Sequence, residues 1–159
     1  EELPITEEDN TTSLLDKVSM ASSKNIVKAL EAISKKEATI HVQDESLVTY
    51  CYKINKKDSY LNFKEDAVSV MRKIQAYNFN PGAKCIINGE IVKILEARIE
   101  KNLTSIKKSS VCIDNQLLIS CKDQAIRLLK IQRAGKKIML AKEALNGWLV
   151  KKGTLINEK

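Results

Sequence analysis

The chain has 159 residues, of which 43% are hydrophobic, 30% are charged and only 4% are aromatic. This length suits one globular domain or parts of two, with a core built mainly from aliphatic side chains. No apolar run approaches the roughly 20 residues that a membrane helix needs, and the acidic start is unlike a signal peptide. We therefore expect a cytoplasmic protein without a membrane partner.

The formal net charge of +7 is distributed unevenly along the chain. Residues 1–65 hold 9 Lys and Arg against 12 Asp and Glu, whereas residues 66–159 hold 18 against 8. A basic segment of this density attracts polyanions such as nucleic acids. A solubilising surface would have the same composition, so the charge alone leaves both interpretations open.

The cysteine and histidine content argues against a metal centre. There is no CxxC pair and only one histidine, His41, so no zinc site of the usual spacing can be formed. The isolated glycines form no phosphate-binding loop, and His41 lacks the partners that a catalytic site needs. We expect binding rather than catalysis, no metal, and cysteines that act as buried small hydrophobes in a reducing compartment, namely Cys51, Cys85, Cys112 and Cys121.

The sequence of the first third of the chain predicts a helix that is followed by a linker. Asn10 to Ser13 offer N-cap side chains, and apolar residues then follow at near-helical spacing, which predicts one or two helices over residues 12–35. From Val42 to Phe63 the pattern loses its period, and this indicates an extended linker.

A helix and a hairpin are predicted next. Glu65 and Asp66 open a helix that runs to about Tyr77. Two apolar runs then flank Asn88-Gly89, the dipeptide preferred in type I′ hairpin turns. Further short strands are predicted at residues 111–113, 117–121, 125–132 and 154–156. Five or six short strands with one helix suggest a small closed β-barrel, a shape that by itself assigns no function.

The predicted strand at residues 125–132 carries an unusual number of cations into a turn at Gly135. Strict alternation would place Leu128, Lys130 and Gln132 on one face. Arg127, Leu129 and Ile131 would share the other face. Beyond the turn, Ala141 to Leu145 should form a short helix that ends at a left-handed Gly147.

These cations form the candidate nucleic-acid site. Each phosphate that they neutralise would add to the salt dependence of binding. Trp148 could stack on a base, although a lone tryptophan is more often a core residue. The candidates are Arg127, Lys130, Arg133, Lys136 and Lys137, with Lys107-Lys108 and Lys151-Lys152 as extensions.

Spaced matches along nearly the whole chain resemble the C-terminal part of the methionyl-tRNA formyltransferase family. Phe63 stands where that family usually has a tryptophan. The most specific matches are Leu128-Leu129, Gln132, Ala134-Gly135-Lys136-Lys137 with Met139, and Leu145-Asn146-Gly147.

The resemblance implies an α+β fold. Residues 1–41 would be the helical tail of a doubly wound formyltransferase domain, residues 42–65 a linker, and residues 66–159 an OB-like barrel that binds tRNA. The whole enzyme would transfer a formyl group from 10-formyltetrahydrofolate to the amino group of methionyl initiator tRNA.

The family's catalytic Asn, His and Asp match no position of this sequence. The resemblance therefore implies that residues 1–159 include no catalytic residue and no folate-binding residue. We expect a monomer with initiator tRNA as its partner. The alternatives are another formyltetrahydrofolate-dependent enzyme with a similar barrel, a stand-alone basic RNA-binding module, or a purely structural domain.

Overall fold

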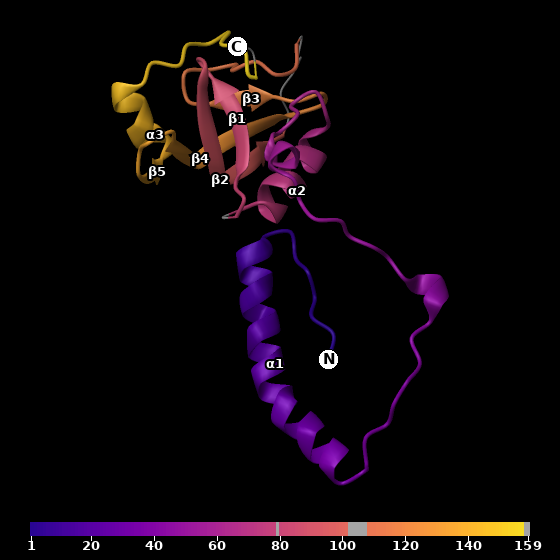
Figure 1. Ribbon diagram of the computed structural model, residues 1–159. Coiled ribbons are helices and arrows are strands. Elements are labelled where there is room, and N and C mark those ends of the chain that lie inside the picture. Colours follow the sequence, from indigo (N-terminus) through magenta and orange to yellow (C-terminus); the bar gives the residue numbers. More distant parts are fainter. Residues whose placement is uncertain (79, 102–107, 158–159) are drawn as a thin grey trace. The chain divides into compact units, whose positions relative to one another are not determined.

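The computed structural model describes residues 1–78, 80–101 and 108–157, which form two units (Figure 1). The first unit is Glu1–Ile54 and the second is Asn55–Lys159. The division lies inside the segment for which the sequence predicts a linker.

The first unit contains one long helix, α1 (Thr11–Ser34). Asn10 caps it: the Asn10 side chain accepts a hydrogen bond from the Ser13 backbone N–H, and the Ser13 hydroxyl accepts one from the Asn10 N–H. This reciprocal arrangement satisfies two backbone donors at the start of the helix. The predicted helix is thus confirmed as a single element, and none of its residues is buried. A 3₁₀ turn at Glu45–Leu47 interrupts the extended chain that follows, where His41 is exposed.

Within its described residues, the second unit contains two α-helices and five strands. Asp66 caps the first of these helices by accepting a hydrogen bond from the Ser69 N–H. In chain order the elements are a 3₁₀ turn (Lys56–Ser59), α2 (Ala67–Ala76), β1 (Ala83–Ile87), β2 (Glu90–Glu100), β3 (Leu118–Ser120), β4 (Ala125–Arg133), β5 (Ile138–Leu140), α3 (Ala141–Ala144) and a 3₁₀ turn (Leu145–Gly147).

The strands form one antiparallel sheet in the order β1-β2-β4-β3, with β5 paired to β4. The predicted hairpin is confirmed, since Asn88 and Gly89 both have positive φ values, 52° and 76°, as a type I′ turn requires. The apolar triplet of β5 was not predicted as a separate strand.

The sheet closes on itself through short segments outside the named strands. Because β3 and β1 are the two ends of the strand order, the chain segments between them complete a ring, and the predicted closed barrel is confirmed. Three isolated antiparallel bridges make this closure: Cys112 with Ile119, Val111 with Leu155, and Ile87 with Ile156.

The core lies inside this ring and under α2. Ala67, Val70 and Ile74 form the buried face of α2, as the spacing of these apolar residues predicts. Leu61 and Phe63, from the end of the predicted linker, are also buried in this core. The aromatic position where the resembling family carries a tryptophan is therefore a packing position here.

Two compensating irregularities change which side chains of β4 face outward. Ile94 pairs with Ile131, and Ala97 pairs with Leu128. Between these two pairs Glu96 pairs with Lys130, which leaves one residue of β2 and one residue of β4 without a cross-strand partner. A bulge of this kind reverses the alternation beyond it. Leu128 and Ile131 are consequently both buried, and the expectation that Ile131 would share a face with Arg127 is wrong.

Two further expectations need correction. Cys51 is exposed, so only Cys85, Cys112 and Cys121 are buried as predicted, and burial raises the pKa of Cys85 to about 12. Gly147 lies in a 3₁₀ turn and is not among the glycines of positive φ, because the short helix continues into this turn instead of stopping at a left-handed residue.

Candidate nucleic-acid interface

Arg127 lies on β4 within a cluster of carboxylates. Its Nη1 atom is 2.6 Å from Oδ2 of Asp114, and its Nε atom is 3.6 Å from Oε1 of Glu100. Nη1 also donates to the carbonyl of Gln116 at 3.0 Å. With 17% of its side chain exposed, the guanidinium already has acceptors within the protein.

Arg133, at the end of β4, is held between a carboxylate and an aromatic ring. Its Nη2 and Nε atoms donate to Oε2 of Glu90 at 2.8 and 3.1 Å, and its guanidinium lies 4.6 Å from the ring centroid of Trp148. Trp148 itself is only 8% exposed. Its ring therefore packs against the barrel and the arginine, as a core residue does.

Lys130 has a looser partner. Its Nζ atom is 3.2 Å from Oε1 of Glu96, with side chains 41% and 55% exposed. An exposed pair of this kind contributes roughly 0–1 kcal/mol to stability.

Lys136 and Lys137 occupy the turn between β4 and β5 and are both exposed. Gly135 opens the turn with φ of 67°, and the Lys136 N–H donates to the Arg133 carbonyl at 3.0 Å. The Gln132 side-chain amide donates to the Lys136 carbonyl at 3.1 Å and fixes the turn to the strand. Among the described residues neither lysine has an ion-pair partner, so both charges face solvent.

The possible extensions of the site lie elsewhere in the second unit. Lys108, Lys151 and Lys152 are exposed, and Lys107 lies outside the described residues. The Lys152 backbone N–H donates to the Asn115 side chain at 2.9 Å. None of the three described lysines lines the groove on the outer surface of the sheet described next.

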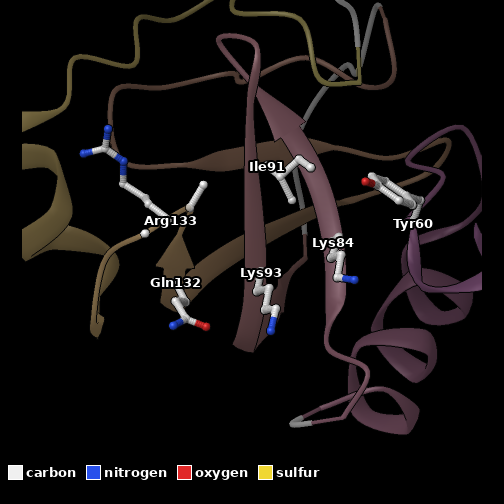
Figure 2. A pocket seen from close by; sticks show the side chains of 8 residues that line it. Tyr60, Lys84, Ile91, Lys93, Gln132 and Arg133 are labelled. Carbon is white, nitrogen blue, oxygen red and sulfur yellow. The ribbon is translucent and has the colours of Figure 1, made fainter. Parts of the chain in front are cut away.

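Figure 2 shows this open groove, which has a volume of about 360 Å³. Gly135 belongs to its lining, so the groove adjoins the turn that carries Lys136 and Lys137. It crosses the outward faces of β1, β2 and β4, and two partly buried lysines, Lys84 and Lys93, stand in it. Its lining consists of Tyr60, Lys84, Ile91, Lys93, Gln132, Arg133, Ala134 and Gly135.

Sequence reasoning missed Lys84 and Lys93. The two residues are direct cross-strand partners in the β1–β2 hairpin, and Lys93 in turn faces Gln132 across β2 and β4. The Asn88-Gly89 turn fixes the hairpin register, so pairing the residues outward from that turn would have brought the two lysines together.

Two further features of the described residues concern metal ligands and membrane spans. These residues contain no group of three His, Cys, Asp or Glu side chains that could hold a metal ion. Within the same residues, no helix combines the length and the hydrophobicity of a membrane span.

Comparisons with known proteins point to one family. Residues 53–149 match the family described as "Formyl transferase, C-terminal domain". A methionyl-tRNA formyltransferase of Ruegeria pomeroyi is 36% identical over 151 residues, which are 95% of this chain and 48% of that protein. One of Sphingopyxis alaskensis is 40% identical over 114 residues, covering 70% of this chain and 37% of the relative.

Solved structures share the fold at lower identity. HypX from Aquifex aeolicus superposes with a TM-score of 0.67 and 17% identity, over 91% of this chain and 27% of that chain. The chain spans about half the length of the curated relatives that it matches.

Proposed function

The chain belongs to the family of formyl transferase C-terminal domains, and from this membership we propose that it is the tRNA-binding part of a methionyl-tRNA formyltransferase. The whole enzyme would transfer a formyl group from 10-formyltetrahydrofolate to the amino group of methionyl initiator tRNA. We assign the folate and the catalytic residues to the remainder of that enzyme.

The observation that carries this proposal is a set of lysines beside the groove that have no ion-pair partner among the described residues. Lys136 and Lys137 project from the turn that borders the groove, and Lys84 and Lys93 lie in it. Lysines on a barrel surface contact phosphates and so orient a nucleic acid without reading its sequence. The barrel would thus hold the tRNA while a neighbouring domain acts on the methionine.

The test is the affinity of the chain for initiator tRNA as a function of salt. We expect log K to fall linearly with log [KCl], because binding releases counterions. The double substitution Lys136→Gln/Lys137→Gln should reduce the steepness of that line by about 0.7–0.9 for each phosphate contact that is lost.

A matched control is available in the same unit. Lys151→Gln/Lys152→Gln removes the same charge from two adjacent exposed lysines away from the groove, and we expect it to leave the slope nearly unchanged. Equal effects of the two double substitutions would show that only net charge matters. A wild-type chain without measurable, salt-dependent tRNA binding would contradict the proposal.

A further inference from the structure

Lys84 and Lys93 form a like-charged pair directly across two neighbouring strands. Both side chains leave the outer face of the hairpin, and Figure 2 shows them next to each other between Tyr60 and Gln132. Two like charges in this position destabilise a sheet.

The other cations on this part of the sheet have carboxylate partners. Lys130 faces Glu96 in the neighbouring cross-strand pair, and Arg133 binds Glu90 from the hairpin. Among the described residues, no carboxylate forms an ion pair with Lys84 or Lys93. The positive charges of Lys130 and Arg133 are therefore neutralised by carboxylates, whereas those of Lys84 and Lys93 have no carboxylate partner among the described residues.

The side-chain stem of Lys93 and the backbone of Lys84 are held in place. A Cβ atom at Gly82 would lie 3.1 Å from Cδ of Lys93, so the stem of this lysine lies closely over the glycine. The carbonyl of Lys84 accepts a hydrogen bond from the Leu61 N–H at 2.8 Å, and Tyr60 forms a parallel bridge with Lys84. The packed stem of Lys93 reduces the conformational entropy that its ammonium group loses when it binds a ligand.

We propose that Lys84 and Lys93 together hold one backbone phosphate of the bound RNA. This inference rests on the proposed function and gives it a specific contact. A phosphate between the two ammonium groups would turn their mutual repulsion into two attractive interactions.

The first experiment measures the salt dependence of tRNA binding for Lys84→Gln, Lys93→Gln and the double variant. If the lysines share one phosphate, the double variant loses only one contact. Its slope should then fall by about 0.9 in a helical region of the RNA, or about 0.7 in a single-stranded one. A fall twice as large means two separate phosphates, and an unchanged slope means that the pair binds none; either result overturns the inference.

The second experiment does not depend on tRNA. At constant ionic strength, replacing chloride by inorganic phosphate should raise the Tm of the wild-type chain more than that of the double variant, because only the wild type offers the site. Equal shifts would overturn the phosphate site. A larger shift in the wild type together with no tRNA binding would retain the site and refute the proposed function.

Folding of the variants can be checked in the same measurement. Removing one or both like charges should leave the Tm at low salt equal to or higher than that of the wild type. Lys151→Gln/Lys152→Gln again serves as the control for net charge. It should keep the wild-type response to phosphate, and a loss of that response there would contradict a site at Lys84 and Lys93.

Discussion

The arginine at the end of β4 illustrates what sequence can and cannot show at the scale of single residues. Arg133 is recognisable from the sequence as one cation of a basic strand. Its partners Glu90 and Trp148 come from the β1–β2 hairpin and from the segment after α3, and only the tertiary structure brings them to Arg133. Local pattern therefore predicts the charge of such a residue but not whether that charge is already compensated.

Arg133→Gln is expected to affect stability directly. It removes a partly buried ion pair and a cation–π contact, which should lower the free energy of unfolding by about 1–3 kcal/mol. Urea denaturation monitored by circular dichroism measures this loss. Lys136→Gln, at an exposed position, should change the same quantity by less than about 0.5 kcal/mol. Equal effects of the two substitutions would contradict this assignment.

Asp114 gives the barrel a dependence on pH. Burial by itself would raise the pKa of this carboxyl, but the N–H groups of Gln116 and Leu118 and the guanidinium of Arg127 hold the pKa below its usual value. A lowered pKa contributes stability that is present above about pH 4 and is lost as the pH falls through the folded-state pKa.

The comparison of wild type with Asp114→Asn isolates this contribution. At neutral pH the variant should be less stable, because asparagine lacks the charge that Arg127 binds. We expect the difference in urea midpoint to narrow as the pH falls below about 4. A difference that stays constant from neutral to acid pH would exclude the titration of Asp114 as its cause.

At the scale of elements, locally encoded features are the ones that the sequence predicts. The capped start of α1, the buried stripe of α2 and the hairpin at Asn88-Gly89 each depend on a few neighbouring residues. The bulges between β2 and β4 depend on two strands far apart in the chain, and they could not be predicted from either one. The same holds for the Lys84–Lys93 pair until the hairpin register is drawn.

Two glycines with different backbone conformations test the turn assignments. Gly89 has φ of 76° and open space around a built Cβ, so Gly89→Ala should cost about 1–2 kcal/mol through backbone strain alone. Gly147 also has open space but no positive φ. Gly147→Ala should therefore raise stability by about 0.4–1 kcal/mol. Thermal unfolding of both variants decides this, and a destabilised Gly147→Ala would contradict the 3₁₀ assignment.

At the scale of the whole molecule, the two units differ in how much packing supports them. The barrel encloses a core that reaches from Leu61 to Ile156, whereas α1 buries none of its residues. Most helical stability in proteins comes from packing of an apolar face. The sequence predicts both the helix and the barrel, but the apolar spacing of α1 alone does not show what that face packs against.

Hydrogen exchange should reveal this difference. We expect the backbone amides of α1 to exchange much faster than those of β2 and β4, because local opening of an unpacked helix costs little free energy. Mass spectrometry of peptides from residues 11–34 and 90–100 provides the comparison. Equal protection of the two segments would mean that α1 is packed as firmly as the barrel.

The stacking of Arg133 on Trp148 has a practical consequence. Trp148 is the only tryptophan of the chain, and the arginine above its ring also lines the groove. An anion that enters the groove alters the electric field at the indole, so the intrinsic fluorescence of the protein should report its occupancy without any attached dye. The same emission moves to longer wavelength when the barrel opens and water reaches the ring.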